Sequence, residues 1–236
     1  MKKGVLYLIP TVIAPNSETK ALSPDLIQLC NLLDYYLVEN VRTARRCLSA
    51  MNISKPIPEI SFHELSKKTE ESKIAGLMQP LFEGKSIGIM SEAGCPGIAD
   101  PGSKAVSYAH EHEIRVEPWV GPSSIFLALM ASGFSGQSFA FSGYLPIDKK
   151  EKSQVIRQLE QKVFKTSETQ IFMETPYRNN QLVEDLLKTC APQMKLCIAK
   201  NINAEDEIIK TDTIENWKKN KPELHKVPCI FLLGLN

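Results

Sequence analysis

The sequence predicts an α/β fold of two domains with mixed, mainly parallel sheets covered by helices, and with a crevice between the domains. Two observations support this fold. Runs rich in branched and aromatic residues alternate with helical patterns, and such alternation favours parallel strands with helices on the sheet faces. A composition break at residues 118–122 places the division between domains covering residues 1–119 and 120–236.

Short segments along the whole chain have the residue content of strands. They are Val5 to Ile9, Tyr35 to Glu39, Ser86 to Met90, Arg115 to Glu117, Phe139 to Gly143, Gln170 to Glu174, Lys195 to Ala199 and Val227 to Leu233. Ser23 and Pro24 open the first clear helix, because serine is a good N-cap and proline suits the first helical turn. Residues 125–131 are all apolar, which predicts a largely buried helix over Ser123 to Ser132.

The overall composition is that of an ordinary globular protein. Of the 236 residues, 43% are hydrophobic, which is enough for a sizeable core. The 28 Lys and Arg residues nearly balance the 27 Asp and Glu residues, so net charge gives no preference for nucleic acid. No segment approaches the ~20 apolar residues needed to cross a bilayer, and we expect no membrane association.

Cysteine spacing and the N-terminus both indicate a cytoplasmic protein. The six cysteines form no C-x-x-C pair and have no interleaved histidines, so we expect free thiols in a reducing compartment and no metal site. The apolar run Gly4 to Pro10 is too short for a signal peptide and predicts a strand. The motifs of P-loop, dinucleotide-binding, nucleophile-elbow and zinc-protease sites are absent from the sequence.

The most distinctive segment is Ser91 to Gly102, which places three glycines and two prolines directly after an apolar strand pattern. Proline fixes φ and lacks an N–H, whereas glycine accepts positive φ and lets a ligand approach the main chain. In an open α/β sheet, ligands sit at the carboxyl ends of the strands. We therefore predict a rigid ligand-binding loop, with a simple connecting turn as the alternative.

Three more strand ends lead into polar or loop-forming residues. They are Ile9-Pro10-Thr11, Val120-Gly121-Pro122-Ser123-Ser124 and Met173-Glu174-Thr175-Pro176. If all the strands run parallel, these loops converge on one edge and form a pocket. Ser123 and Ser124 also open the apolar helix, whose N–H groups suit an anionic ligand group, although simple N-capping explains the serines equally well.

A small basic cluster follows the strand that ends at Glu39. It consists of Arg42, Arg45 and Arg46. Such clusters usually form a solvated helix face, but the preceding strand is expected to end at the same sheet edge as the Gly/Pro-rich segment. The cluster is therefore either a surface feature or a site for a phosphate or carboxylate.

Several blocks, in the same order along nearly the whole chain, resemble one family. They are Leu6 to Ile13, Ser91 to Gly102 in the pattern S-[DE]-A-G-x-P-x-I-x-D-P-G, Gly121-Pro122-Ser123, Phe141 to Pro146, and Ile171 to Arg178. On these blocks the chain resembles the tetrapyrrole methylase superfamily of S-adenosylmethionine-dependent methyltransferases. Within it, the chain is most similar to the members that methylate small-subunit ribosomal RNA.

The resemblance implies two α/β domains with a cofactor cleft between them, in a homodimer, and S-adenosyl-L-methionine as the cofactor. Carried over position by position, the cofactor contacts are expected largely from main-chain groups. The residues are Thr11, Val12, Ala93, Gly94, Cys95, Ile98, Ser123, Ser124, Glu174 and Ala199. The helix N-terminus is expected to bind the methionyl carboxylate of the cofactor, because helix N-termini bind anionic groups.

Methyl transfer depends mainly on alignment of the nucleophile, methyl carbon and sulfur, so no catalytic triad is expected. Positioning is worth about 7–11 kcal/mol, more than the roughly 10²–10⁴-fold that a single base contributes. If the acceptor is a ribose hydroxyl, a base has to take its proton, and Glu39 and Glu92 are the candidates. For each, a structural carboxylate is the alternative. Arg42 and Arg178 are the candidates for substrate binding.

The chain departs from the RNA-methylating pattern on the acceptor side. E-D-T-R becomes Glu39-Asn40-Val41-Arg42, and A-R-E-[LI]-T becomes Ala199-Lys200-Asn201-Ile202-Asn203. Methylation of RNA, at a small-subunit ribosomal RNA cytidine ribose by resemblance, is the leading hypothesis. Methylation of a tetrapyrrole or another small molecule is the second. A non-catalytic module that binds S-adenosylmethionine is the third.

Overall fold

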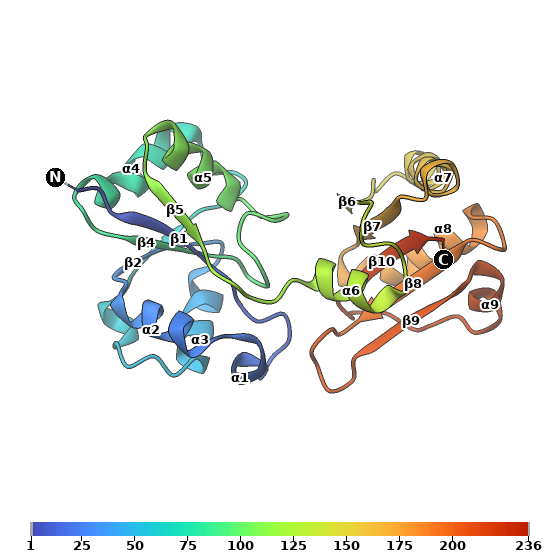
Figure 1. Cartoon of the computed structure of the whole chain (residues 1–236), viewed down its shortest axis with the longest axis horizontal. Coiled ribbons are helices and arrows are strands. Elements are labelled where there is room, and N and C mark those ends of the chain that lie inside the picture. Colours follow the sequence, from blue (N-terminus) through green and yellow to red (C-terminus); the bar gives the residue numbers. More distant parts are fainter. Residues whose placement is uncertain (1, 236) are drawn as a thin grey trace. The chain divides into compact units, whose positions relative to one another are not determined.

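Each half of the chain builds its own five-stranded sheet with helices packed on it (Figure 1). In this computed structural model, which describes residues 2–235, one unit ends at Ser123 and the next begins at Ser124. The α/β class predicted from the sequence is confirmed. None of the helices within residues 2–235 has the length and apolar content that a membrane crossing requires.

The first sheet is entirely parallel, in the order β3-β2-β4-β1-β5. Its strands are β1 (Val5–Ile9), β2 (Tyr35–Val38), β3 (Ser61–Glu64), β4 (Ile87–Met90) and β5 (Arg115–Pro118). Its helices are α1 (Glu18–Ala21), α2 (Pro24–Leu32), α3 (Val41–Ala50), α4 (Glu71–Phe82) and α5 (Gly102–Glu111), with a 3₁₀ turn η1 (Ile57–Glu59). Strand β1 lies between β4 and β5, so the loops that follow these three strands leave the same edge of the sheet.

Helices cover both faces of this sheet, over two separate apolar clusters. One cluster includes Leu26 of α2 and Leu48 of α3. The other includes Met78 of α4 and Ala105 of α5. Because both faces are covered, central strand β4 is buried at every position and reads in the sequence as a continuous apolar run.

Local signals set where two of these helices begin. Ser23 Oγ accepts the N–H of Leu26 at 3.2 Å, and Pro24 is the first residue of α2, as the sequence predicts. Asn40 caps α3 in the same way and accepts the N–H of Thr43 at 3.1 Å. This cap fixes the path of the chain directly after Glu39.

The second sheet is mixed, in the order β6-β7-β10-β8-β9. Its strands are β6 (Phe139–Tyr144), β7 (Thr169–Met173), β8 (Lys195–Lys200), β9 (Ile208–Thr213) and β10 (Cys229–Gly234). Its helices are α6 (Ser124–Ser132), α7 (Lys149–Thr166), α8 (Asn179–Thr189) and α9 (Ile214–Lys219), with a 3₁₀ turn η2 (Pro176–Arg178). Only β6 and β7 pair in parallel among these strands. This sheet is therefore mixed, which the predicted class of mixed, mainly parallel sheets includes. Strands β8 and β9 pair antiparallel because the connection 201–207 is too short for a parallel crossover.

Two strands and the burial of one helix also differ from the sequence prediction. Strands β3 and β9 lie at sheet edges and expose much of their surface, so they lack the apolar pattern of a buried strand. Helix α6 buries Ala128 and Leu129, but Phe126 and Met130 are 54% and 79% exposed. The prediction of a largely buried helix is wrong, because α6 buries three of its nine residues. It packs against β8, β9 and β10, and the ring of Phe126 also meets Phe139 of β6 edge-on.

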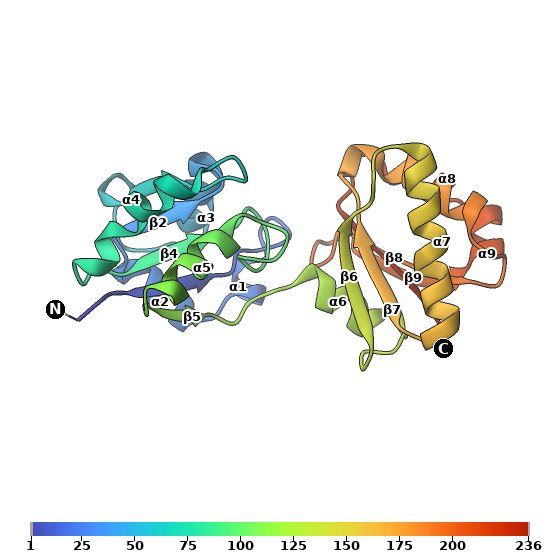
Figure 2. The ribbon, with the colours of Figure 1, turned by 90° about the horizontal axis from the view of Figure 1, so that it is seen from above.

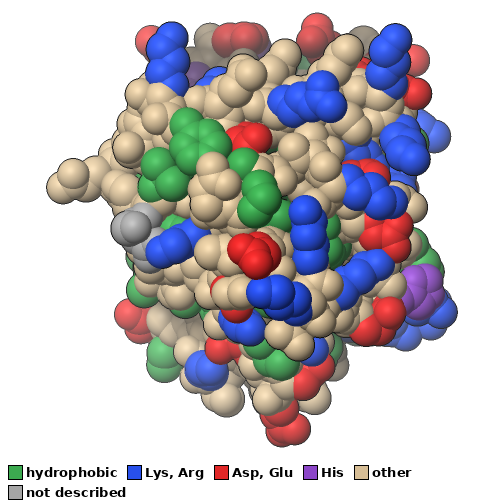
Figure 3. Space-filling view, turned by 90° about the vertical axis from the view of Figure 1, so that its right-hand side faces the viewer, with side chains coloured by type: hydrophobic (Ala, Val, Ile, Leu, Met, Phe, Trp, Pro, Cys, Tyr) green, Lys and Arg blue, Asp and Glu red, His purple; other side chains and the backbone are tan. Residues whose placement is uncertain are grey.

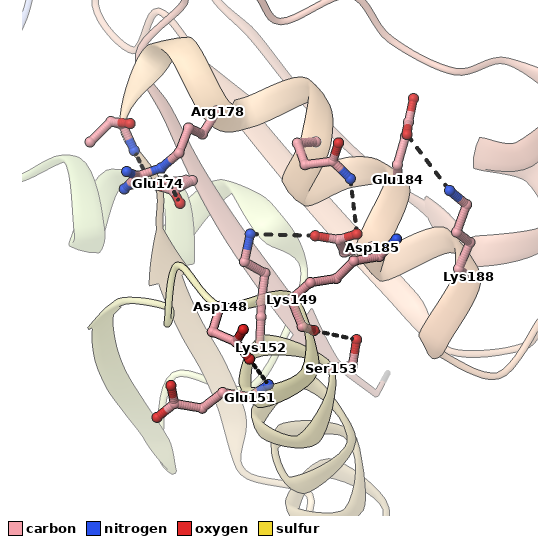
Figure 4. A network of polar contacts seen from close by, with 12 residues as sticks. Asp148, Lys149, Glu151, Lys152, Ser153, Glu174, Arg178, Glu184, Asp185 and Lys188 are labelled. Atoms are coloured by element: carbon pink, nitrogen blue, oxygen red, sulfur yellow. Dashed lines mark hydrogen bonds and ion pairs between the residues drawn. The ribbon is translucent and has the colours of Figure 1, made fainter.

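The main core of the second unit lies between the sheet and helices α7, α8 and α9, and Figure 2 shows α7 running along the sheet. It includes Ile156, Leu186 and Trp217. Beside it lies an ion pair in which Lys152 Nζ is 3.4 Å from Asp185 Oδ2, with side chains 4% and 3% exposed (Figure 4). Because a buried charge that loses its partner is strongly destabilising, this pair fixes α7 against α8.

Candidate functional site

The loops after β1 and β4 are joined by reciprocal main-chain hydrogen bonds. Thr11 N donates to Gly94 O at 2.9 Å, and Gly94 N donates to Thr11 O at 3.2 Å. The Ser91 hydroxyl lies 3.3 Å from Ala93 O and 3.2 Å from Gly94 O, so it can donate to either carbonyl. These bonds hold residues 91–102, which we call the Gly/Pro loop, against the end of β1.

The loop after β5 reaches the same point. A Cβ on Gly121 would lie 2.2 Å from Pro10 Cβ and Cγ, so only glycine permits this approach. Cys95 Sγ donates to Pro122 O at 3.4 Å. The same carbonyl would lie 3.4 Å from a Cβ on Gly94. Three strand-end loops of the first unit therefore meet at Gly94, and we call this meeting point the loop junction.

Asp100 fixes the shape of the Gly/Pro loop from within. Its Oδ1 accepts the N–H groups of Gly97 at 2.7 Å and Gly102 at 2.8 Å. Its Oδ2 is buried and has no hydrogen-bond partner in the part of the chain that the structure describes. Burial raises the pKa of Asp100, although the two N–H groups and nearby Lys67 act in the opposite direction. Gly94 and Gly97 have φ values of +78° and +82°, which explains why this loop needs glycine.

The residues of the first unit predicted to contact a cofactor lie on or beside the loop junction. Thr11 is buried, Val12 and Cys95 are half-buried, and Ala93 and Ile98 are exposed. Burial raises the pKa of the Cys95 thiol, so this side chain is neutral near pH 7 rather than an activated nucleophile. The group offers main-chain atoms and small or apolar side chains.

Both predicted bases lie near this loop. Burial raises the pKa of Glu39, and the negative charges of Asp100 and Glu92 raise it further, against the effect of Lys67. Glu92 is exposed, and its Oε1 accepts the hydroxyl of Thr43 at 3.3 Å. The raised pKa of Glu39 suits a proton acceptor. Although carboxylates gather here, residues 2–235 contain no group of three or more His, Cys, Asp or Glu placed to hold a metal ion.

The three arginines of α3 all lie on its exposed side. Arg42 stands in the first turn, next to the Asn40 cap. The Arg45 guanidinium lies 5.4 Å from the ring centroid of Phe62, and Arg46 is also exposed. This exposure is compatible with both the surface and the phosphate-binding interpretation of the cluster.

In the second unit, Glu174 and Arg178 form a two-bond ion pair at the end of β7 (Figure 4). Arg178 Nε donates to Oε1 at 2.8 Å and Nη2 donates to Oε2 at 2.7 Å, while Thr175 N donates to Oε2 at 2.5 Å. Burial alone raises the pKa of Glu174, but the bonds from Arg178 and Thr175 outweigh it and hold this pKa below its ordinary value. Because the carboxylate is engaged, Glu174 has mainly main-chain groups to offer a ligand.

The remaining predicted cofactor residues are divided between the units. Ser123 ends the first unit and Ser124 begins α6 in the second, and both are half-buried. Ala199 lies inside β8, in register with Ile230 and Ile209, and is fully buried within its unit. The structure thus brings Thr11, Gly94 and Cys95 together at the loop junction, and the cofactor roles of all the predicted residues stay predictions.

The sequence reasoning missed two features. An Asp before Pro-Gly is a turn signal whose carboxylate bonds to the main chain two residues on, so the sequence contained a signal for Asp100. The exposed Tyr177 had no such signal. Its neighbours His225 and Lys226 come from a loop distant in sequence.

The family model for Tetrapyrrole (Corrin/Porphyrin) Methylases matches residues 27–217. The chain belongs to this family. The resemblance inferred from the sequence blocks is confirmed. The loop junction is therefore part of a protein that belongs to a family of methyltransferases.

Curated proteins are similar to this chain along most of its length. Three of them, each named ribosomal RNA small subunit methyltransferase I, show the extent of the similarity. The protein from Vibrio cholerae is 29% identical over 206 residues, which cover 87% of this chain and 67% of the relative. The one from Halalkalibacterium halodurans is 32% identical over 185 residues, which cover 78% of this chain and 60% of the relative. The one from Buchnera aphidicola subsp. Schizaphis graminum is 29% identical over 235 residues, covering 98% and 78%. The chain thus spans 60–78% of the length of these relatives.

Solved structures share the fold at low identity. A conserved hypothetical protein from Aeropyrum pernix K1 has a TM-score of 0.72 at 14% identity, covering 100% of this chain and 86% of that one. The methyltransferase CobJ has a TM-score of 0.64 at 14% identity, covering 98% and 94%. Uroporphyrin-III-C-methyltransferase from Thermus thermophilus has a TM-score of 0.59 at 16% identity, also covering 98% and 94%. These likenesses confirm the family fold.

We expect Glu174→Gln to destabilise the second unit at neutral pH and to matter less in acid. The bonds from Arg178 lower the folded-state pKa of Glu174, so its contribution is present above the ordinary value of 4.5 and is lost as pH falls through the lower folded value. Urea unfolding followed by Trp217 fluorescence, in a Trp119→Phe background, measures the gap between wild type and variant at each pH.

Glu215→Gln is the control for this comparison, because Glu215 pairs with Lys219 on an exposed helix surface. Its effect should stay below roughly 1 kcal/mol at every pH. A stability gap for Glu174→Gln that is the same at neutral and acid pH would contradict the assigned pKa direction.

Proposed function

We propose that the protein is an S-adenosylmethionine-dependent methyltransferase that methylates RNA, at the 2′-hydroxyl of a small-subunit ribosomal RNA cytidine. The observation that carries the proposal is the loop junction at Gly94 in a member of the tetrapyrrole methylase family. The choice of RNA rests on the names of the curated relatives. A homodimer working in the cytoplasm belongs to the same proposal.

The residues at the loop junction fit S-adenosylmethionine. Val12 and Ile13 are half-buried apolar residues and Ile98 is an exposed one, while Ala93 and the buried Gly94 add no bulky side chain. A small-molecule site of this kind combines apolar walls with a few polar groups that fix orientation. When bound, S-adenosylmethionine supplies an electrophilic methyl group on a sulfonium sulfur. The chain has to bind it, orient it and exclude water.

The proposed cofactor contacts extend into the second unit. Ser123 and Ser124 stand at the start of α6, where unpaired N–H groups and the positive end of the helix dipole suit a carboxylate. Glu174 and Ala199 would contribute main-chain groups, because the carboxylate of Glu174 is bonded to Arg178 and the side chain of Ala199 is buried.

Glu39 is the proposed base. Its raised pKa lets the carboxylate accept the proton of the acceptor hydroxyl more readily than an ordinary glutamate would. Glu92 is the second candidate, but it is exposed and bonded to Thr43. Arg42 is proposed to bind a substrate phosphate beside Glu39, and Arg178 to do so with the N–H groups that Glu174 does not use.

One observation favours an enzyme over a non-catalytic module, because it concerns the residues on the side where the acceptor is expected to bind. Asn40 replaces an acid of the RNA-methylating pattern, yet it caps α3 with its side-chain oxygen. Asn and Asp are equally good at this position. The replacement therefore preserves the local geometry around Glu39 and Arg42.

We expect wild-type protein to bind S-adenosylmethionine at micromolar concentrations and Gly94→Val to lose that binding. At Gly94, where φ is +78°, a Cβ would lie 3.4 Å from both Ile13 Cγ2 and Pro122 O, so a branched side chain would fill the loop junction. Isothermal titration calorimetry measures the affinity. Absence of saturable binding by the wild type would remove the proposed function.

Gly97→Val is the matched control. It carries the same backbone strain at φ +82°, but nothing lies within 4 Å of its Cβ. It should unfold at about the same temperature as Gly94→Val and still bind the cofactor. Equal loss of binding in both variants would mean that loop strain, rather than a filled junction, abolishes binding.

To identify the acceptor, the protein is incubated with radiolabelled S-adenosylmethionine and one of two substrates. One substrate is a small ribosomal subunit reconstituted from unmodified RNA, and the other is a precorrin-type tetrapyrrole. We expect label on the RNA, removed by Gly94→Val. Label on the tetrapyrrole alone would select the small-molecule hypothesis. Label on neither, despite cofactor binding, would select the non-catalytic module.

We expect Glu39→Gln to lower kcat by roughly 10²–10⁴-fold and to leave cofactor affinity unchanged, since the amide cannot accept the proton. The acid limb of the pH–rate profile should disappear in this variant. Glu92→Gln keeps a side-chain oxygen for Thr43 and serves as the comparison. Wild-type turnover in Glu39→Gln together with a loss in Glu92→Gln would transfer the role to Glu92.

A further inference from the structure

A large aromatic ring stands exposed at the carboxyl end of β7. Tyr177 lies in the 3₁₀ turn η2 and is 70% exposed. It follows Glu174 closely, so it lies at the same sheet edge as one of the predicted site residues. Single exposed rings are common on protein surfaces, so the meaning of this one depends on how it is held and on what lies beside it.

The backbone that carries the ring is held on two sides. Behind it, the Glu174–Arg178 ion pair fixes both ends of the turn. In front of it, Lys226 N donates to Pro176 O at 3.0 Å. The ring is thus presented by a rigid frame rather than by a loose loop.

The loop 223–227 is itself fastened to the start of α8. Asn180 Oδ1 accepts the N–H of Leu224 at 2.8 Å, and Asn179 Nδ2 donates to Val227 O at 2.6 Å. Strand register brings this loop to the edge where β7 ends, because Ile230 at the start of β10 pairs with Met173. Both side chains beside the ring come from this fastened loop.

Those two neighbours are polar and exposed. The His225 ring meets Tyr177 edge-on, with centroids 6.0 Å apart and planes at 78°. Lys226 Nζ lies 5.9 Å from the centroid of Tyr177. The acid of this loop, Glu223, accepts bonds from the Asn180 amide and from His225 N.

Charge over the wider surface is mixed. Figure 3 shows many Lys and Arg side chains on one face of the molecule with Asp and Glu between them. Such a pattern has no preference for an anion, so the specific signal is one exposed ring with a cation and an imidazole beside it. That combination suits an unpaired nucleobase and its phosphate, because a base stacks on an aromatic face while Lys binds the backbone.

We propose that Tyr177, with His225 and Lys226, is a stacking site for one unpaired base of the RNA substrate. The inference rests on the proposed RNA methylation and assigns a substrate contact outside the loop junction. Tyr177 provides the stacking face, and Lys226 binds the adjacent phosphate. The site is expected to have no base preference, since every base has a face that can stack.

The test measures fluorescence anisotropy of a labelled single-stranded oligoribonucleotide of mixed sequence. Tyr177→Leu should weaken binding by roughly 5- to 150-fold, the range for loss of one stacked base, whereas Tyr177→Phe should bind like the wild type. An abasic oligomer of the same length should bind wild type and Tyr177→Leu equally. Lys226→Gln should lower the slope of log affinity against log salt by about 0.7.

Phe164→Leu is the matched control, because Phe164 is another exposed ring of the same unit, on α7 at 46% exposure. It should leave RNA affinity unchanged. If wild type binds and methylates RNA while Tyr177→Leu binds it equally well, the stacking site is refuted and the proposed function stands. If the wild type binds S-adenosylmethionine but no RNA, both the stacking site and the RNA substrate are refuted.

Discussion

The candidate site depends on one pair of main-chain hydrogen bonds, between Thr11 and Gly94. Each bond stabilises the fold by only about 0.5–1.5 kcal/mol, so their importance lies in position. They hold the end of β1 against the Gly/Pro loop, and the close approach of Gly121 to Pro10 adds the loop after β5. Because the contacts are made by main chain, many side chains around them can change without moving the loop junction.

Two glutamates at strand ends show how surroundings divide roles. Glu39 is half-buried near Asp100 and Glu92, which raises its pKa and favours proton transfer. Glu174 is buried too, but Arg178 takes both of its oxygens and lowers its pKa, which makes it part of the frame. The same residue type after the same kind of strand is thus suited to chemistry in one unit and to structure in the other.

Much of the first unit could be predicted from the sequence, because a parallel sheet buried on both faces leaves continuous apolar runs such as β4. The Gly/Pro loop could be predicted too, since positive φ and close approach demand glycine. Edge strands β3 and β9 could not, because their exposed residues carry no apolar pattern. The exposed side of α6 could not either, since composition cannot tell which face of an apolar helix meets the sheet.

The three loops of the junction come from the beginning, the later part and the end of the first unit, since Thr11, Gly94 and Pro122 are far apart in the chain. Contacts between such distant segments form late, after the entropy of closing long chain segments has been overcome. During synthesis, a nascent chain that has not yet emerged past Pro122 lacks the third loop. Closure of the loop junction around Gly94 therefore reports that the whole first unit has been made and folded.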